Sequence, residues 1–499
     1  MGRRGANLAG RFLTAAAATP RREAVVVVDD HRPARCTYAD VADRTRRLAG
    51  ALRTRGVTAG DRVGVLLDDG IEHLEALLAC FLLGAAPVNL SHRDTEDERR
   101  AVLEVADAHL VLHEPDLAPL AQTALCTCDW DAAMDAAEPV ELEPERSGDD
   151  EYVLFTGGTT GRPKGVRWRH DDLYVGALAP AARSAVRTMP ASPFAHGTGQ
   201  WTSLATLLQG GTVVCRRDRG FDPERTLDAI EAEDVSYLVV VGDAFARPLV
   251  DVLDACPGRW RLSTLTTLLS GGAPLSPGVK DDLLRLVPTM LVVDGFGASE
   301  SGGHGRMVSV AGTVADGPPR FEFDDDTDVL GDDHRPVAVG EIGWLARRGR
   351  VPLGYLGGGP DGDEQAFPVV DDVRWAIPGD RARRNGDGSI TVLGRGASTI
   401  NTGGHKVHAE EVERALRAHP AVIDAVVVGT PDERWGERVT AVVSAAAGAT
   451  DGDTIVAHCR ERLASYKVPR VVLVDDVRRT PAGKPDYAWA REVATTPAG

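Results

Sequence analysis

The sequence has no excess of positive charge. Its 499 residues include 56 lysines and arginines against 74 aspartates and glutamates, which gives a formal net charge of -18 at pH 7. A protein that grips nucleic acid or an anionic membrane over a broad face needs a basic surface. The charge therefore disfavours nucleic acid or an anionic membrane as a general partner, although it leaves room for one local anion pocket.

Cysteines are few, and long apolar runs are missing. The seven cysteines are an odd number, and only Cys126 and Cys128 lie close together, without the paired spacing of a zinc site. We therefore expect free or buried thiols rather than disulfides or a metal, as in a reducing cytoplasm. Residues 76–88 form the most apolar helix-like segment, which is too short to span a bilayer. Arg11 interrupts the apolar run near the start, so we predict neither a signal peptide nor a membrane span.

The chain is too long for one hydrophobic core, so we expect at least two domains. Unbroken apolar strands at 24–28 and 63–67 alternate with helical segments, a pattern typical of βαβ units in a parallel sheet. A capping box at Thr37 begins the first helix, and a second helix is expected over 72–83. Residues 86–88 are expected to lead into a turn. The acidic segment 138–150 predicts a linker.

Residues 152–168 read YVLFTGGTTGRPKGVRW, which predicts a strand, a loop and a second strand. Glycines let backbone amides approach an anion closely, threonines add hydroxyl donors, and Lys164 adds a point charge, so the loop suits a polyphosphate. Its composition fits a plain hairpin loop equally well. The loop is not a Walker A motif, because Pro163 precedes Lys164 and no Ser or Thr follows it.

Further segments combine polar groups with flexible turns. Residues 192–201, reading SPFAHGTGQW, contain His196, which taken alone suits a histidine satisfied in a turn. Strands at 265–270 and 290–293 run into GGAP at 271–274 and DGFGASE at 294–300, the kind of strand end where open α/β sheets place ligands. Asp243 follows another strand and is either a helix N-cap or a polar group at a pocket edge. Near the end of the chain, TPAGKP presents Lys484 on a Pro/Gly loop.

In this order, the motifs resemble those of the adenylate-forming superfamily, which includes acyl-CoA synthetases, adenylation domains of peptide synthetases and luciferases. The run TGGTTGRPKG is similar to its phosphate-binding signature. The likeness covers nearly the whole chain and is closest to bacterial acyl-CoA synthetases for fatty or sterol-side-chain acids.

The resemblance implies an α/β fold with two domains. Residues 1–394 would form a large N-terminal acyl- and ATP-binding domain, built of βαβ-type sheets packed with helices plus a distorted barrel. Residues 395–499 would form a small, mobile α/β domain. The family hinge falls at Ala397, where relatives commonly have Asp or Lys, so the exact hinge stays open, and Gly396 could absorb the rotation.

The resemblance also implies roles for single residues. ATP would be bound by Thr156, Gly157, Gly158, Thr159, Lys164, Gly271, Gly272, Ala273, Asp294, Gly295, Phe296, Ser299, Asp380 and Arg395. The acid would lie among Phe194, His196, Trp201, Asp243 and Phe296. The catalytic residues would be Lys484, Thr160, Glu300 and His196, with Thr160 and Glu300 near Mg²⁺. The CoA channel would be lined by Thr402, Gly403, Gly404 and Lys406.

The activity implied is ATP-dependent conversion of a carboxylic acid to an acyl-adenylate, followed by transfer to CoA. ATP, Mg²⁺ and CoA would be required, the partner would be a small-molecule acid, and a homodimer is allowed. The Phe-Ala-His at 194–196 replaces the usual Asp of amino-acid-activating relatives, which argues against an α-amino acid.

Alternatives remain open. One is an adenylating enzyme with a non-CoA acceptor, such as a carrier-protein ligase, or an ATP-dependent diazotase that uses nitrite and an aromatic amine; Gly403 and Gly404 favour CoA. A non-catalytic nucleotide-binding regulator is disfavoured, because Lys484, Glu300 and Asp380 are all present.

Overall fold

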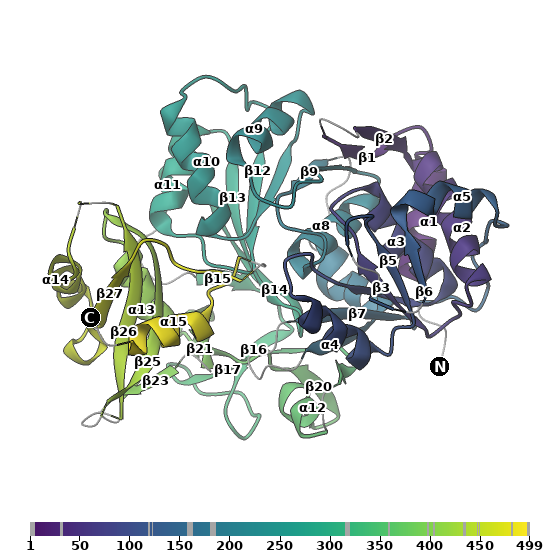
Figure 1. The fold of residues 1–499 in the computed structure, drawn as a ribbon. Helices are drawn as coiled ribbons and strands as arrows, with labels where there is room; N and C mark the ends of the chain where they lie inside the picture. Colours follow the sequence, from purple (N-terminus) through teal and green to yellow (C-terminus); the bar gives the residue numbers. More distant parts are fainter. Residues whose placement is uncertain are drawn as a thin grey trace.

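The computed structural model describes residues 5–29, 33–117, 120–121, 123–156, 163–179, 186–314, 320–357, 360–396, 399–402, 405–432, 436–446, 448, 450–480 and 483–496. It is a mixed α/β protein with a large N-terminal body and a separate C-terminal domain, as the sequence predicts (Figure 1). Among these residues, none of the helices combines the length and the apolar character that crossing a membrane requires.

The N-terminal body begins with a parallel sheet in the order β4-β3-β5-β6, with helices packed around it. Its elements are α1 (Leu8–Ala18), α2 (Tyr38–Thr54), β3 (Arg62–Leu66), α3 (Ile71–Leu83), β4 (Ala86–Asn89), α4 (Glu96–Ala106), β5 (Leu110–His113), β6 (Thr123–Cys126), η1 (Thr127–Asp129) and α5 (Trp130–Asp135). The capping box at Thr37 forms with Asp40, and every residue of α3 is buried. Both predicted helices are confirmed.

Residues 86–88 belong to strand β4 and lead into the turn at 92–93, as expected. Gly84, at φ 74°, ends α3 and lets Ala86 pair with Arg62 of β3. One expectation for this region is wrong. The sulfurs of Cys126 and Cys128 are joined in a disulfide, where free thiols were expected. The chain turns from β6 into η1 there and brings the two Cα atoms to 5.2 Å, which is within the range that a disulfide spans.

A long mixed sheet forms the centre of the body, in the order β19-β20-β17-β21-β22-β15-β14-β13-β12-β11-β9-β10-β1-β2, with β16 paired to β17. Its strands and the helices between them are β1 (Glu23–Val27), β2 (Ala34–Thr37), β9 (Arg187–Pro190), α8 (Gly197–Leu208), β10 (Thr212–Cys215), α9 (Pro223–Ala232), β11 (Tyr237–Val240), α10 (Asp243–Ala255), β12 (Thr267–Gly271), α11 (Pro277–Leu286), β13 (Leu291–Ala298), β14 (Gly302–Ser309), β15 (Arg320–Phe323), β16 (Thr327–Leu330), β17 (Ile342–Arg348), α12 (Pro360–Ala366), β19 (Val369–Val370), β20 (Val373–Ala376), β21 (Asp380–Arg384) and β22 (Ile390–Arg395). Helices α10 and α11 pack on β11 to β13 through a shared apolar core. From β13 to β22 the neighbouring strands are antiparallel, so the parallel part of the sheet ends at β13.

A smaller sheet presents the loop of residues 157–163. Strands β7 (Glu151–Thr156) and β8 (Lys164–Arg169) pair antiparallel, and β18 (Gly354–Leu356) joins the far edge of β8. The predicted pair of strands around the loop is therefore confirmed. The helical turns α6 (His170–Leu173) and η2 (Tyr174–Leu178) follow β8.

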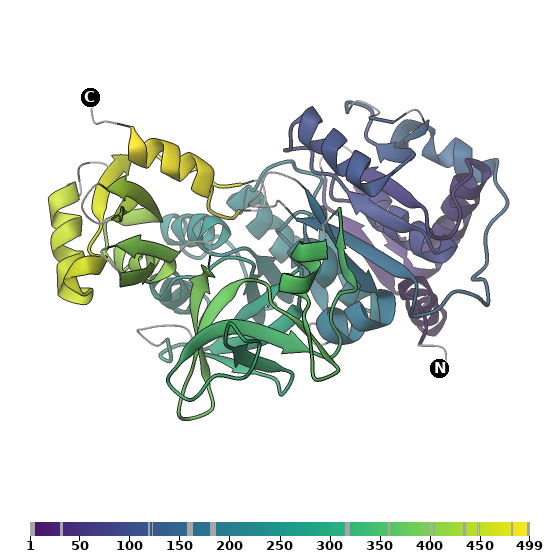
Figure 2. The same cartoon turned by 90° about the horizontal axis from the view of Figure 1, so that it is seen from below.

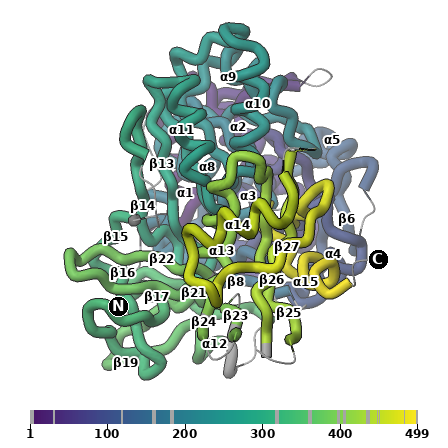
Figure 3. Tube along the Cα trace, turned by 90° about the vertical axis from the view of Figure 1, so that its left-hand side faces the viewer, coloured from purple at the N-terminus to yellow at the C-terminus, as the bar shows by residue number. Residues whose placement is uncertain are grey.

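The C-terminal domain is a mixed sheet in the order β24-β23-β26-β25, with β27 paired to β26. Its elements are β23 (Thr399–Thr402), β24 (His405–His408), α13 (Ala409–Arg417), β25 (Val422–Asp432), β26 (Gly436–Ala445), α14 (Gly452–Arg462), η4 (Ser465–Lys467), β27 (Arg470–Val474) and α15 (Tyr487–Thr495). Figure 2 shows this domain on the side of the molecule away from the N-terminal parallel sheet, and Figure 3 views it from its own side, in front of the body.

Candidate active site

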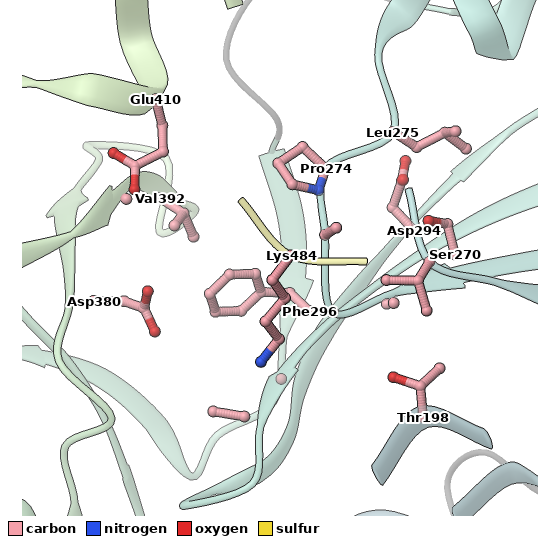
Figure 4. Close-up of a pocket in the computed structure, with 18 of the residues that line it drawn as sticks. Thr198, Ser270, Pro274, Leu275, Asp294, Phe296, Asp380, Val392, Glu410 and Lys484 are labelled. Atoms are coloured by element: carbon pink, nitrogen blue, oxygen red, sulfur yellow. The ribbon is translucent and has the colours of Figure 1, made fainter. Parts of the chain in front are cut away.

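A cavity of about 3910 Å³ lies where the C-terminal domain meets the N-terminal body. This volume exceeds what one small ligand needs, so a nucleotide and a second substrate can share it. Most of the candidate residues that the structure describes line this cavity, namely Thr156, Lys164, His196, Trp201, Gly271, Gly272, Ala273, Asp294, Gly295, Phe296, Ser299, Glu300, Asp380 and Lys484. Figure 4 shows Asp380 on one side, Asp294 with Ser270 on the other, and Phe296 and Lys484 between them.

Other candidates fall outside what the structure describes. Gly157, Gly158, Thr159 and Thr160 of the phosphate loop belong to this group, as do Gly403, Gly404 and the expected hinge residue Ala397. The backbone of Arg395 lies in β22 and that of Lys406 in β24. Thr402 is placed at the end of β23, where it pairs with Gly436 of β26, and it does not line the cavity.

The phosphate loop is anchored through the end of its hairpin. Thr156 and Lys164 are register partners, so both ends of the loop are fixed at one point of the small sheet. The Lys164 Nζ lies 5.2 Å from the centre of the Tyr355 ring, a cation–π contact. The Tyr355 hydroxyl donates a hydrogen bond of 3.3 Å to Glu300 Oε1. Tyr355 therefore joins the loop lysine to the carboxylate at the end of β13.

Sequence reasoning missed Tyr355. It lies in β18, whose pairing with β8 places Tyr355 opposite Val166. A single tyrosine between Gly354 and Leu356 carries no signal by itself. Only the pairing of two strands that are almost 200 residues apart brings it to the site.

The segment around His196 is fixed from behind by buried groups. The Phe194 side chain is fully buried, and its backbone N–H donates to Asp69 Oδ1 at 2.8 Å. Its ring packs edge-on against His73, 5.6 Å away. Phe194 therefore does not line the cavity, and its assignment as a pocket wall is wrong: a ring in this alternating segment points into the core and anchors the turn.

Trp201 does line the cavity, and its indole is held in place. The Trp201 Nε1 donates to the Tyr152 hydroxyl at 2.9 Å, and the ring contacts Trp168 edge-on at 6.3 Å. The Trp168 Nε1 in turn donates to the backbone oxygen of Ser299 at 2.9 Å. This chain of contacts couples strand β7, helix α8 and the Ser299 turn.

Lys484 reaches the cavity on a loop that is tied at both ends. The Thr480 N–H donates to the Lys484 carbonyl at 2.7 Å, and Arg479 Nη1 donates to the Gly483 carbonyl at 3.0 Å. Arg479 is itself held by a bidentate pair with Asp424, at 2.7 Å for both contacts. Gly483, at φ 76°, packs against Phe245 at the start of α10.

The positive charge of Lys484 helps to lower the pKa of His196. Burial, together with the positive charges of Lys484, Arg93 and His92, lowers the pKa of His196 to about 4. The imidazole is therefore neutral near pH 7. Lys484 and His196 both line the cavity.

The two glycine-rich turns lie side by side because their strands pair in register. Ser270 of β12 faces Asp294 of β13, and Gly271 faces Gly295. A Cβ at Gly271 would meet nothing closer than 3.7 Å, so the backbone is open to a ligand there. The Phe296 ring packs on Phe321 with centroids 5.2 Å apart.

Asp243 supports one of these turns from outside the cavity. It is the first residue of α10, after Gly242, and its Oδ1 accepts a hydrogen bond of 2.8 Å from the backbone N–H of Ser276. The N-cap of α10 is Gly242, so the N-cap interpretation of Asp243 is wrong. Its place at the pocket edge stays a prediction.

Asp380 begins β21 on the opposite side of the cavity and is 6% exposed. Gly379 precedes it at φ 93°, and the Gly379 carbonyl accepts from the Gly396 N–H at 2.8 Å. A carboxylate there suits a diol, which donates two hydrogen bonds. The oxygens of Glu300 and Thr156, both lining the cavity, suit the hard ligand field of Mg²⁺, which keeps several waters. Across the described ranges, no cluster of three or more His, Cys, Asp or Glu could hold a metal by itself.

Comparison with known proteins agrees with this geometry. Residues 12–356 match the family model of the AMP-binding enzyme, and residues 411–484 match that of the AMP-binding enzyme C-terminal domain. The chain is 37% identical to a 3-oxocholest-4-en-26-oate--CoA ligase of Rhodococcus rhodochrous, over 94% of this chain and 93% of the relative. It is 38% identical to a medium/long-chain-fatty-acid--CoA/3-oxocholest-4-en-26-oate--CoA ligase of Mycobacterium tuberculosis, over 95% and 94%.

Solved structures share the fold. An anthranilate CoA ligase in complex with anthranoyl-AMP superimposes with a TM-score of 0.85 at 20% identity, covering 98% of this chain and 97% of that chain. ATP-bound MatB from Rhodopseudomonas palustris gives 0.83 at 26% identity, with 98% of each chain covered. The protein uses ATP, Mg²⁺ and CoA. The chain thus belongs to the AMP-binding enzyme family, as an ATP-dependent, AMP-forming acid–thiol ligase.

Proposed function

We propose that the acid activated by this ligase is a fatty acid or an acid on a sterol side chain. The relatives named above act on acids of these kinds. Small and apolar groups next to helix α8 support the proposal, since Ala177, Trp201 and Gly303 line the cavity there. The observation that supports the reaction is that Lys484 of the C-terminal domain lines the same cavity as His196, Asp380 and Glu300.

In the first half-reaction, the substrate carboxylate attacks the α-phosphorus of ATP, pyrophosphate leaves, and an acyl-adenylate forms. We propose that Asp380 accepts from the ribose hydroxyls, and that Lys164 with the threonines at 156, 159 and 160 holds the departing phosphates. Lys484 would bridge the carboxylate and the α-phosphate, where negative charge accumulates. Such positioned cations contribute most of the catalysis in phosphoryl chemistry. Mg²⁺ near Glu300 and Thr160 would supply further charge neutralisation.

In the second half-reaction, the CoA thiol attacks the acyl carbon and AMP leaves. We propose that the C-terminal domain, residues 395–499, rotates relative to residues 1–394 and replaces Lys484 with the segment from Thr402 to Lys406. The position of Thr402 outside the cavity that Lys484 lines supports this order. Rotation about a few residues at a domain boundary is a common way to alternate two sites.

We also propose a cytoplasmic location, where ATP and CoA are available.

A homodimer stays a prediction. Sedimentation of the purified protein measures its oligomeric state. A single species of 53.0 kDa would contradict the dimer.

The acid is tested with a panel scored by pyrophosphate release, with and without CoA. The panel contains fatty acids of graded length, a steroid side-chain acid, an aromatic acid, and nitrite with arylamines. We expect release with fatty or steroid acids and acyl-CoA formation when CoA is added. Turnover with nitrite and no acid would contradict the proposal.

A further inference from the structure

His304 is a buried histidine in the wall of the cavity. It lies on β14, is 2% exposed and lines the cavity together with Phe296, whose ring centroid is 5.8 Å from its own. The His304 Nε2 has no hydrogen-bond partner among the residues that the structure describes. A buried polar atom without a partner is costly, so native proteins seldom keep one without a role. His304 therefore suits a polar contact with a ligand in the cavity.

The imidazole of His304 is neutral near pH 7. Burial, and secondly the positive charge of Arg347, lower the pKa of His304 to about 3. A neutral imidazole carries one proton, so one ring nitrogen donates a hydrogen bond and the other accepts one. The nitrogen that carries the proton therefore decides which ligand groups Nε2 can bind.

The partners of the other ring nitrogen set the tautomer. The His304 Nδ1 lies 3.4 Å from Thr327 Oγ1, and this hydroxyl donates to Asp324 Oδ1 at 3.0 Å. Asp324 forms an ion pair with Arg347 at 2.7 Å, and its oxygens act as acceptors. Because Thr327 has one proton to donate, its oxygen accepts from Nδ1. His304 therefore carries its proton on Nδ1, and its Nε2 is an acceptor.

Strand pairing fixes this network at the cavity wall. Thr327 of β16 and Arg347 of β17 are register partners. The Arg347 Nη1 also donates to the carbonyl of Gly303, the residue before His304. A protonated amine on a ligand would be repelled by the charge of Arg347, whereas a neutral hydroxyl would not. The donor that suits Nε2 is thus a hydroxyl group.

We propose that His304 is a specificity-determining residue, whose Nε2 accepts a hydrogen bond from a hydroxyl group on the carbon skeleton of the activated acid. The inference rests on the proposed class of acid, which it narrows to fatty or sterol-side-chain acids that carry a hydroxyl. An unsubstituted acid leaves Nε2 without a partner, and an oxo oxygen sets one acceptor against another. Thr327, which does not line the cavity, is a positioning residue that acts through His304.

The first test compares matched acids in pyrophosphate release. One pair is a sterol-side-chain acid with a 3-hydroxyl and its 3-oxo counterpart, the form for which the relatives described above are named. The second set is a fatty acid with the hydroxyl at graded positions, with the unsubstituted acid as reference. In at least one set we expect the best-placed hydroxyl to raise kcat/KM about tenfold, the typical effect of one hydrogen bond.

Variants assign this preference to His304. His304→Phe keeps a ring and removes the acceptor, so the preference for the hydroxyl should fall about tenfold. Thr327→Val removes the group that accepts from Nδ1 and lets the proton move to Nε2, so the preference should fall and the oxo acid should gain. Thr391→Val is the matched control. Thr391 is 9% exposed, as Thr327 is, and does not line the cavity either, so the preference should stay as in the wild type.

Nitrogen magnetic resonance of labelled histidine, assigned with His304→Phe, reads the tautomer without turnover. We expect the proton on Nδ1 in the wild type and a mixture of tautomers in Thr327→Val. If His304→Phe fails to fold, Thr327→Val still tests the preference. A proton on Nε2 in the wild type would overturn the inference, as would a hydroxyl preference that is absent from both sets or unchanged in both variants.

The acid class and the role of His304 fail in different ways. Release with unsubstituted or oxo acids alone contradicts the role of His304 and leaves the acid class standing. Release with no fatty or sterol acid contradicts the acid class. A hydroxyl preference among aromatic acids that His304→Phe abolishes would then still support His304, and the lack of such a preference would contradict it.

Discussion

At the scale of single residues, the site depends on groups that hold the reactive ones in place. Tyr355 contacts both Lys164, at the end of the phosphate loop, and Glu300, which follows strand β13. Its ring contacts the ammonium, and its hydroxyl donates to the carboxylate. A carboxylate that is fixed by a donor loses less freedom when substrate binds.

Tyr355→Phe separates these two contacts, because it keeps the ring and removes the hydroxyl. A hydrogen bond to a charged group is worth about 1.5–3 kcal/mol, and water can replace part of it, so we expect about a tenfold loss in kcat/KM for ATP. Tyr355→Leu, which removes both contacts, should lose more. Steady-state pyrophosphate release measures both. Equal activity of Tyr355→Phe and wild type would remove the role of the hydroxyl.

His196 gives a pH-dependent prediction at the same scale. Its pKa is lowered to about 4 by burial first and by the charge of Lys484 second. The neutral form therefore predominates above pH 4, and His196 should add no acidic limb between pH 5 and 7 to the rate profile. Nuclear magnetic resonance of labelled histidine, assigned with His196→Gln, measures this pKa directly.

Replacing Lys484 by Met should raise the pKa of His196 while leaving it below 6.5, because burial persists. A pKa that does not move in Lys484→Met would mean that the lysine is not beside His196 in solution.

At the scale of elements, the loop from Arg479 to Lys484 acts as one unit. Asp424 holds Arg479, Arg479 holds the Gly483 carbonyl, and Gly483 rests on Phe245 of α10. The contact with Phe245 is a point where the C-terminal domain touches the body next to the cavity. The position of Lys484 therefore depends on how Gly483, the residue directly before it, fits against Phe245.

Gly483→Ala should impair acyl-adenylate formation more than it impairs stability. The added Cβ would lie 3.1 Å from a Phe245 ring carbon, and the positive φ of 76° adds strain of about 1 kcal/mol. Gly448→Ala is the matched control, since Gly448 has φ 69° and no neighbour within 4 Å of the added Cβ. We expect similar small losses of thermal stability in both, but slower adenylation only in Gly483→Ala. Equal rates in the two variants would contradict the docking of this loop.

Many of the helices and strands could be predicted from the sequence, and there are physical reasons why the remaining features could not. Strands that end in glycine turns could be predicted, because buried parallel strands need continuous apolar residues and these runs are visible in the sequence. The directions of side chains in loops could not be predicted. Phe194 turns inward, and Asp243 turns toward Ser276, only because distant segments pack there. Tyr355 is likewise meaningful only through partners far along the chain.

At the scale of the whole molecule, the cavity is shared between two domains. The N-terminal body supplies Asp380, Glu300 and the glycine turns, whereas the C-terminal domain supplies Lys484. Moving one domain can therefore remove Lys484 without disturbing the groups that the N-terminal body contributes to the cavity. The resemblance predicts this division into two domains, and Ala397, at the position that the resemblance gives for the hinge, lies outside the described residues.

The most direct test of the account separates the two half-reactions in Lys484→Ala. One assay measures acid-dependent pyrophosphate release, and the other measures acyl-CoA formation from supplied acyl-adenylate. We predict that Lys484→Ala loses at least 100-fold in the first, since a cation at the reacting phosphate contributes several kcal/mol, and stays within about threefold of wild type in the second. Equal loss in both half-reactions would contradict the assignment of Lys484 to adenylation alone.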